Sequence, residues 1–178
     1  MDTLHLIPLE RRHLTVLRNL MQLYLYDFSE LLCEGEEGYV NEQGLFELDF
    51  DLHRYADGRG YWGYLARVDV PQVGSRWAGF ALISDQADKA PPGVGGRNVD
   101  EFFVLRCFRR RGIGRQMAER VFETYRGFWQ IAEIGPNRAA QAFWRRVVER
   151  YTGGRFVEFV VEEERGPIVW QTFDSSTW

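Results

Sequence analysis

The sequence predicts one α/β domain of the α+β type, built from about seven strands and about four helices. Apolar residues form short runs that suit strands, and they recur at helical spacing over longer segments. A glycine-bearing turn joins one such strand to one such helix. The length of 178 residues and the hydrophobic content of 45% suit a single domain with a substantial core, so we expect one domain over residues 1–178.

The N-terminal half begins with a short strand over 4–9 and a long amphipathic helix. The apolar positions of that helix recur at helical spacing from Leu14 to Leu31, and Gly35 and Gly38 follow as breaks. Alternating residues then predict two strands, which a turn rich in Pro and Gly separates from the next one. The other elements expected here are a loop with a short second helix over 39–60, strands over 62–70 and 77–83, and a turn over 90–97.

The C-terminal half alternates strands with helices before it closes on two strands. The expected elements are a strand over 98–105, a helix over 112–126, a strand over 129–134, a helix over 137–151, and strands over 155–162 and 167–173. The whole order is therefore strand, one or two helices, three strands, helix, strand, helix and two strands.

The most informative stretch is the turn from Arg109 to Arg115, which lies between a strand and a helix. The first amides of a helix have no partners within the helix, and the helix dipole places partial positive charge there. Gly112 and Gly114 allow an anion to approach the backbone, and the neighbouring side chains are cationic. The turn therefore predicts a site for a phosphate or pyrophosphate group.

Two common phosphate-binding loops do not fit this turn. The Walker loop needs a Lys followed by Ser or Thr, and the only Lys of the chain is Lys89. The dinucleotide fingerprint needs a third Gly where Met117 stands. What remains is the spacing Arg-x-x-Gly-x-Gly over Arg109, Gly112 and Gly114, which resembles the acetyl-coenzyme A signature of the GNAT acetyltransferase superfamily.

The resemblance extends along essentially the whole chain, because the expected order of elements is that of the GNAT fold. Residues 104–108 fit the strand end before the turn, although Arg106 stands where many members have Pro. Residues 137–144 carry the Asn, Ala and aromatic residues that the family often has. The resemblance implies the GNAT acyl-CoA acyltransferase fold, with a central mixed, mostly antiparallel sheet. The chain also resembles a subgroup of predicted bacterial acetyltransferases with no assigned substrate.

The resemblance further implies an N-acetyltransferase that uses acetyl-CoA as its co-substrate. The backbone at the strand end would hold the pantetheine arm and the thioester, and the turn would hold the pyrophosphate. Asn137 also suits the N-cap of its own helix, which is the competing interpretation of that residue. The implied cofactor-binding residues are Phe103, Val104, Leu105, Arg109, Arg110, Arg111, Gly112, Ile113, Gly114, Arg115, Asn137 and Phe143.

Catalysis needs a base, because a primary amine with a pKa of about 10.4 is protonated at neutral pH. Glu101 is the first candidate, since it lies on the strand that leads to the cofactor and many relatives have an acid there. A solvated or ion-paired carboxylate is the competing interpretation of Glu101. Asp100 and Glu133 are the alternatives, and Glu133 lies on the neighbouring strand.

Trp144 stands where the family usually has a Tyr that acts as general acid. An indole N–H donates a hydrogen bond but does not release a proton. Trp144 is kept as a candidate catalytic residue beside Glu101 and Glu133, with a wall of the cofactor site or packing in the core as the competing interpretations. The usual acid is therefore either absent or replaced by Tyr24, Tyr26 or Tyr151. A covalent route through Cys107 is disfavoured, because a buried or inert thiol is expected there. The amine is then expected to attack the thioester directly.

The charge is distributed unevenly along the chain. Residues 27–60 hold ten acids and two bases, a balance of −8, whereas residues 106–155 hold twelve Arg and four Glu, a balance of +8. An acidic segment beside an anion site predicts a cationic acceptor, either a small-molecule or a peptide amine, with ordinary solvated surface as the alternative.

Two other classes of protein remain open. A catalytically inactive sensor or scaffold that binds coenzyme A would explain Trp144. A nucleic-acid-binding module is less favoured, because the net charge of the chain is −4. Neither nucleic acid nor membrane is therefore expected as a partner.

Composition supports three further expectations. The chain has no apolar run long enough to span a membrane and no signal peptide, so we expect a cytoplasmic protein. Neither the two cysteines, Cys33 and Cys107, nor the three histidines show metal-ligand spacing, so no metal is expected. The aromatic runs at 24–28 and 61–64 are compatible with an acceptor pocket, a homodimer interface or the core.

Overall fold

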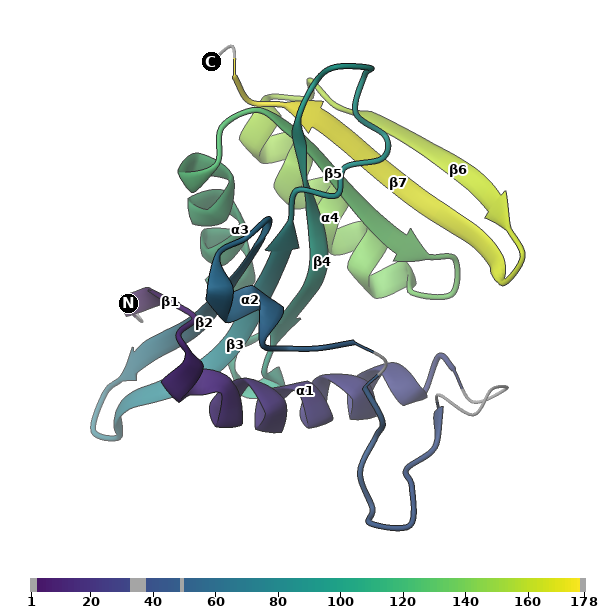
Figure 1. Cartoon of the computed structure of the whole chain (residues 1–178). Helices are drawn as coiled ribbons and strands as arrows, with labels where there is room; N and C mark the ends of the chain where they lie inside the picture. Colours follow the sequence, from purple (N-terminus) through teal and green to yellow (C-terminus); the bar gives the residue numbers. More distant parts are fainter. Residues whose placement is uncertain (1–2, 33–37, 49, 177–178) are drawn as a thin grey trace.

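The computed structural model describes residues 3–32, 38–48 and 50–176, and it confirms the α+β class. Within these residues the elements follow the predicted order, with seven strands in one sheet (Figure 1). They are β1 (Thr3–Pro8), the 3-10 turn η1 (Arg11–His13), α1 (Leu14–Ser29), α2 (Arg54–Asp57), β2 (Tyr61–Val70), β3 (Gly74–Ser84), β4 (Gly96–Val104), the 3-10 turn η3 (Arg106–Phe108), α3 (Ile113–Thr124), β5 (Phe128–Ile134), α4 (Arg138–Thr152), β6 (Val157–Glu163) and β7 (Gly166–Asp174).

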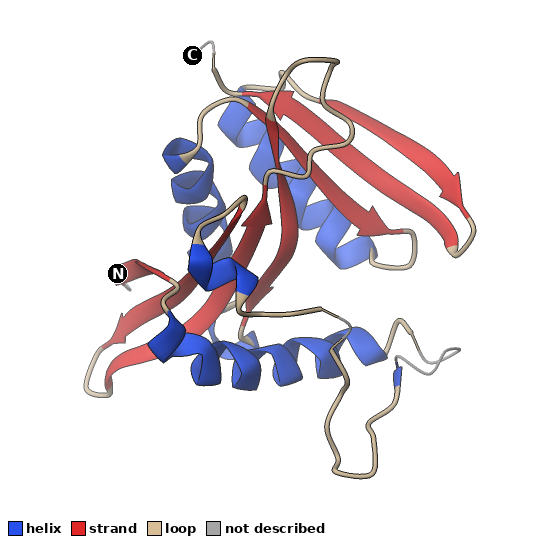
Figure 2. Cartoon of the chain, viewed as in Figure 1, coloured by secondary structure: helices blue, strands red, loops and turns tan. Residues whose placement is uncertain are grey.

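The sheet is mixed and mostly antiparallel, as expected. Its strand order is β1-β2-β3-β4-β5-β7-β6, and the only parallel neighbours among the described strands are β4 and β5. Helices pack on both faces (Figure 2). On one face α3 and α4 bury Phe122 and Trp144 against Trp129 of β5. On the other face α1 and α2 bury Leu17 and Tyr55 against β2, β3 and β4.

The helix α1 ends at Ser29, two residues before the predicted end at Leu31. The hydroxyl of Ser29 donates to the carbonyl of Tyr26 at 2.8 Å, a bond by which a Ser side chain competes with regular helix hydrogen bonding. The predicted break at Gly35 lies outside the described residues, and so does Cys33.

The strands β4 and β5 pair along only part of their length. Gly96–Val99 pair with Phe128–Ile131, and beyond these residues β4 remains paired with β3 while β5 remains paired with β7. The register between β3 and β4 shifts near this point, because Leu82 pairs with Glu101 while Ile83 pairs with Val99. Asp100 is thus an extra residue in β4, a bulge of the kind that bends a strand. The two strands consequently diverge and leave a gap between their C-terminal ends.

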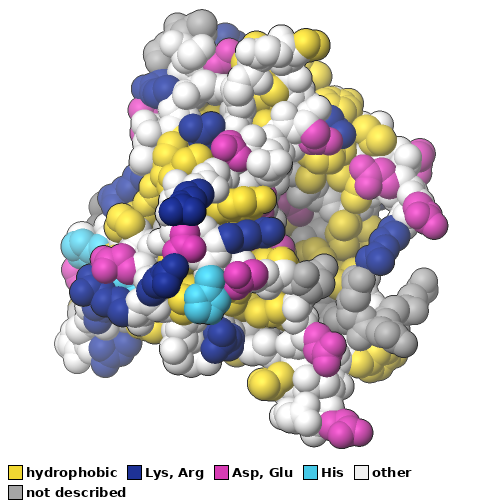
Figure 3. Space-filling view, viewed as in Figure 1, with side chains coloured by type: hydrophobic (Ala, Val, Ile, Leu, Met, Phe, Trp, Pro, Cys, Tyr) yellow, Lys and Arg dark blue, Asp and Glu magenta, His cyan; other side chains and the backbone are white. Residues whose placement is uncertain are grey.

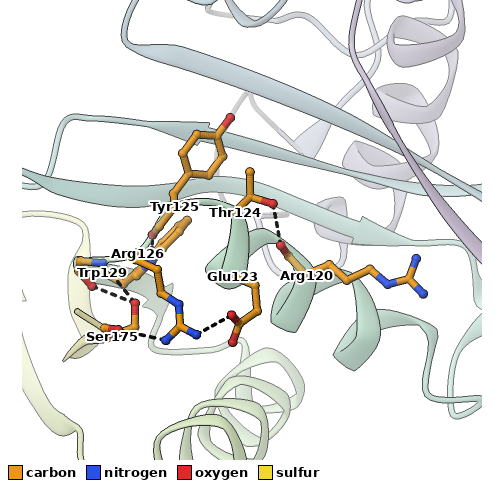
Figure 4. Close-up of polar contacts among 8 residues, drawn as sticks. Arg120, Glu123, Thr124, Tyr125, Arg126, Trp129 and Ser175 are labelled. Atoms are coloured by element: carbon orange, nitrogen blue, oxygen red, sulfur yellow. Dashed lines mark hydrogen bonds and ion pairs between the residues drawn. The ribbon is translucent and has the colours of Figure 1, made fainter. Parts of the chain in front are cut away.

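The opposite end of β5 is fastened to α3 and to the C-terminal segment (Figure 4). The indole N–H of Trp129 donates to the carbonyl of Tyr125 at 2.9 Å. Arg126 donates to the carbonyl of Ser175 at 3.1 Å and pairs with Glu123 at 2.6 Å. Because these contacts hold the start of β5 in place, the divergence from β4 is confined to the other end, where the predicted site lies.

Candidate active site

The N-terminus of α3 has the geometry of an anion site. Gly112 precedes the helix with φ of 80°, a left-handed conformation that glycine adopts without a Cβ clash. Its carbonyl accepts a hydrogen bond from the amide of Gln116 at 3.0 Å. Within the described residues no side chain caps this end of α3. The amides that open the helix therefore remain for an external acceptor, as a pyrophosphate would require.

Gly114 has a different role from Gly112, although the sequence interpretation gave both the task of admitting the anion. A Cβ at Gly114 would lie 3.1 Å from Cε2 of Phe143 and 3.4 Å from Cγ2 of Val104. The missing side chain therefore allows α3 to pack closely against α4 and β4. This packing places the ring of Phe143 beside the first turn of α3.

Two arginines near the turn are bound to an acid of α1. Arg109 donates through Nε to the carbonyl of Val104 at 2.7 Å, and its guanidinium pairs with the carboxylate of Asp27. Arg106 pairs with the same carboxylate at 2.7 Å. Arg106, which replaces the usual Pro, and Arg109 therefore join the end of β4 to α1. Asp27 was not among the predicted site residues, because nothing in the sequence links it to residues about eighty positions away.

Arg115 and Arg111 also make contacts within the chain. Arg115 pairs with Glu119 one helical turn later at 3.0 Å. Arg111 donates to the carbonyl of Cys107 at 3.3 Å. Arg110 is exposed and has φ of 60°, which is uncommon for a residue other than glycine. Strain of this kind gathers at ligand-binding turns.

The end of β4 offers backbone rather than side chains. Phe103 and Val104 are buried, and the amide of Leu105 donates to the carbonyl of Ala78 on β3 at 2.8 Å. Hydrogen-bonding groups alternate sides along a strand, so the amide of Val104 is directed to the opposite edge, toward the gap. The amide of Val104 is thus a backbone donor that suits the predicted role of this segment, which is to hold the thioester.

Glu101 lies on β4 at the gap and faces α1. The hydroxyl of Tyr24 hydrogen bonds its carboxylate. Burial, followed by the charge of Glu101, raises the pKa of Tyr24 well above its usual value. The ring of Tyr24 packs edge-on against Phe80 and Phe103, with centroids 5.9 Å and 5.8 Å away, so its hydroxyl is held at the gap.

Glu133 reaches the same gap from β5. The pKa of Glu133 is raised to about 8, mainly by burial; a hydrogen bond from the indole of Trp144 opposes the rise, and the charge of Glu101 adds to it. Glu133 is therefore mainly protonated at neutral pH. A carboxyl group that keeps its proton at neutral pH suits the role of an acid.

Trp144 is a buried residue of α4, with 3% of its surface exposed. Its ring packs edge-on against Phe102 and Phe143, with centroids 4.9 Å and 5.0 Å away. Its polar contact is the hydrogen bond to Glu133. Trp144, which stood among the predicted catalytic residues, therefore packs in the core and orients Glu133.

The alternative acids and bases lie in different surroundings. Asp100 accepts hydrogen bonds from Tyr55 at 2.8 Å, Ser84 at 2.7 Å and Asn98 at 2.6 Å, so its oxygens are occupied. Tyr151 packs against Phe173 near the opposite end of β5, away from the gap. Tyr26 is 64% exposed on α1. Of the three predicted alternative acids, Tyr24 is the one that contacts Glu101.

The structure bears on two further expectations. Cys107 was expected to be buried or inert, but it is exposed, because it lies on η3 outside the core. Asn137 caps α4 by accepting a hydrogen bond from the amide of Ala140 at 3.1 Å, which is the structural role that the sequence also allowed, and its role toward a cofactor stays a prediction. The aromatic run at 61–64 is partly core, since Tyr61 packs against Tyr55.

Residues 22–148 match the sequence profile of the acetyltransferase (GNAT) family. The chain belongs to this family. It is a GNAT acetyltransferase by this match, and its fold agrees. No curated protein sequence matches the chain.

Solved structures with the same fold have low sequence identity to this GNAT protein. Spermidine N-acetyltransferase from Vibrio cholerae, in complex with CoA and spermine, has a TM-score of 0.62 and 15% identity, covering 97% of this chain and 96% of that chain. The ribosomal-protein-S18-alanine N-acetyltransferase from Escherichia coli has a TM-score of 0.57 and 14% identity, covering 100% and 96%. An acetyltransferase from Thermus thermophilus has a TM-score of 0.61 and 17% identity, covering 97% of each chain.

Two features are missing from the part of the chain that the structure describes. No described helix is both long and apolar enough to cross a membrane. Nor do the described residues contain a group of three or more His, Cys, Asp or Glu side chains that could hold a metal ion.

Proposed function

We propose that this GNAT protein transfers the acetyl group of acetyl-CoA to an amine, which attacks the thioester directly. The observation that carries the proposal is that Glu101 of β4 and Glu133 of β5 lie near enough for their charges to interact, and that burial raises the pKa of Glu133 to about 8. The uncapped N-terminus of α3 lies next to that gap and suits the pyrophosphate. The cofactor would be held by the α3 amides, by the backbone of Phe103–Leu105 and by the ring of Phe143.

Glu101 is the proposed base. Deprotonating a primary amine at pH 7 costs roughly 4.6 kcal/mol, so a carboxylate at the point of attack is needed to take the proton. The nitrogen–carbon bond forms as the amine attacks, and the carbon–sulfur bond breaks as CoA leaves. The amide of Val104 would donate to the oxyanion that develops between these two steps.

Glu133 is the proposed acid for the departing thiolate. A thiol has a pKa of about 8.5, so proton transfer from a carboxyl group with a pKa of about 8 is nearly balanced in energy. Tyr24, whose pKa is raised well above its usual value, is a poorer donor. Tyr24 and Trp144 are therefore positioning residues for Glu101 and Glu133.

The acceptor is proposed to be a primary amine that is cationic in solution. Support comes from the proposed base Glu101 at the gap rather than from the whole acidic segment 27–60. Asp27 of that segment is paired with Arg106 and Arg109, and Asp57 is paired with Arg11 at 2.9 Å. These pairs reduce the free negative charge that the sequence suggested.

The test is an assay of the purified protein with acetyl-CoA and a panel of primary amines, read by mass spectrometry. Thiol reagents are avoided because Cys107 is exposed and would react. Formation of acetylated amine and CoA in equal amounts is the expected result. The mass of the protein should stay unchanged in acetyl-CoA alone, whereas an acetylated Cys107 would contradict direct attack.

The same assay distinguishes the alternatives. Calorimetric binding of acetyl-CoA without turnover of any amine would favour the inactive coenzyme A sensor. Retention on heparin that falls with salt would favour the nucleic-acid module. Against that module, many arginines of the basic segment are already paired within the chain, among them Arg106, Arg109 and Arg115.

A further inference from the structure

The sheet has one face that no described helix covers, over β5, β7 and β6. The helix α4 covers the opposite face of these strands, where Arg145 pairs with Glu158 of β6 at 2.6 Å. The helices α1 and α2 lie on the uncovered side, but they pack against β2, β3 and β4. Figure 1 shows β5, β7 and β6 open toward the viewer, with α4 behind them.

This uncovered face is apolar. Residues that pair across antiparallel strands point to the same side of the sheet. Two neighbouring rows of such partners are apolar throughout, and we call them the open apolar face. The open apolar face consists of Ala132, Trp170 and Phe159 in one row and Ile134, Ile168 and Val161 in the next. Trp170 is buried, and the other five are partly exposed. Hydrophobic side chains gather over these strands in Figure 3.

One end of the open apolar face is closed by the loop that follows β3. The ammonium group of Lys89 lies 4.4 Å from the ring centroid of Trp170, and the amide of Lys89 donates to the side chain of Gln130 at 2.8 Å. The other end, at Ile134 and Ile168, lies beside the gap, because Ile134 follows Glu133 on β5.

The open apolar face is continuous with the proposed site of amine attack. Glu101 faces the side of the sheet on which α1 lies, since Tyr24 of α1 hydrogen bonds it. The open apolar face is on that same side, opposite α4. A molecule whose amine lies at Glu101 would therefore extend onto Ile134 and Ile168 rather than into solvent.

We propose that the acceptor is a small amine with an apolar aromatic or branched body, which lies on the open apolar face while its amino group lies at Glu101. This inference rests on the proposed function and specifies its substrate class. The proposed base Glu101 complements one ammonium group, and the apolar rows favour a body without charges. Neighbouring strands are about 4.8 Å apart, and every second residue along one strand is about 6.6 Å apart. The area of the two rows therefore suits an acceptor whose body has one or two rings.

A polyamine does not fit this arrangement equally well. Its further ammonium groups would lie against apolar side chains, where burying a charge without a partner is unfavourable. The six residues that define the face include no acid. The inferred class is therefore a monoamine of the arylalkyl type, and tryptamine, ethylamine and spermidine serve as probes.

The experiment compares kcat/KM for the three probes in three proteins. The wild type should use tryptamine at least about 10-fold better than ethylamine or spermidine, a typical effect of an apolar pocket. Ile168→Ser should lower kcat/KM for tryptamine about 10-fold, mainly through KM, and leave ethylamine unchanged. Val160→Ser is the matched control, because Val160 is 59% exposed on the opposite face of β6. Val160→Ser should leave both values unchanged.

Distinct outcomes contradict the inference and the proposed function. Two results would overturn the inference alone. One is a wild type that prefers spermidine, and the other is an equal loss of kcat/KM for tryptamine and ethylamine in Ile168→Ser. Binding of acetyl-CoA without turnover of any amine overturns the proposed function and the inference together. A dimer that Ile168→Ser dissociates in light scattering would make the open apolar face a subunit interface and overturn the inference. If Ile168→Ser does not fold, Phe159→Ala provides the same comparison.

Discussion

The indole of Trp144 on α4 donates a hydrogen bond to the carboxyl group of Glu133 on β5. Trp144 stands where the family usually has a tyrosine acid, and the pKa of its partner Glu133 is raised to about 8. In the proposed mechanism, Glu133 takes the part of that tyrosine as the acid. Because Glu133 is a single titrating group, its protonation should affect both the stability of the fold and, in the proposed mechanism, the rate of turnover.

Glu133→Gln should change how stability depends on pH. The pKa of Glu133 is raised to about 8 from an ordinary value of 4.5, so between these values the folded state binds more protons than the unfolded state. The free energy of unfolding of the wild type should therefore fall as pH rises through this window, by up to about 1.4 kcal/mol per pH unit. Glu133→Gln removes this titration while keeping an acceptor for Trp144.

Urea unfolding at pH values of about 5 and 8 checks this expectation. The change in the free energy of unfolding between these pH values should differ between wild type and Glu133→Gln by about 1 kcal/mol or more. Glu162→Gln, at an exposed position of β6, is the control. Parallel pH profiles for wild type and Glu133→Gln would show that Glu133 titrates normally.

Glu101→Gln should lower turnover by roughly 100-fold or more, as expected for the loss of a general base. Cofactor affinity should stay nearly intact, because Glu101 lies on β4 and contacts Tyr24 of α1, whereas the pyrophosphate is assigned to the N-terminus of α3. The pH–rate profile of the wild type should rise with deprotonation of the base or the amine, and fall above about 8 as Glu133 loses its proton. Normal turnover by Glu101→Gln would transfer the role of base to another group.

Gly114→Val should weaken acetyl-CoA binding by roughly 2 kcal/mol, about the value of one or two charge-assisted hydrogen bonds. The physical reason is that new atoms would push Phe143 and the first turn of α3 apart. Titration calorimetry measures the effect, with circular dichroism to confirm folding. Gly95→Val is the control, since a Cβ at Gly95 meets nothing within 4 Å. Equal affinities in the two folded variants would sink the assignment of the turn.

Arg109→Ala should lower the melting temperature more than Arg110→Ala. Arg109 holds both the carbonyl of Val104 and the carboxylate of Asp27, whereas Arg110 is exposed with φ of 60°. The pair with Asp27 is only partly buried, so we expect a loss of about 1 kcal/mol. Thermal melts of both variants provide the comparison, and equal melting temperatures would mean that the contact of Arg109 with α1 adds no stability.

Local patterns in the sequence were enough to predict the order of the elements and the glycine-bearing turn before α3. Alternation at a period of two marked β2 and β3, and helical spacing marked α1, because each pattern reports which face of an element is buried. The spacing of Arg109, Gly112 and Gly114 located the turn, since glycine conformations and helix-end amides are local properties. Tertiary packing then separated the roles of the two glycines, because the neighbour of Gly114 is Phe143 of α4.

The properties of the candidate site depended on contacts between residues far apart in the chain. Sequence placed Glu101 and Glu133 on neighbouring strands, but the protonation of Glu133 follows from burial and from Trp144. Sequence likewise marked Tyr24 as one apolar position of a helix, whereas its bond to Glu101 needs α1 to cross β4. The residues by themselves determined the elements and the turn, because those depend on backbone preferences and side-chain periodicity. Only the tertiary structure decided which acids share the gap and which face stays open, because desolvation and pairing depend on what packs beside each group.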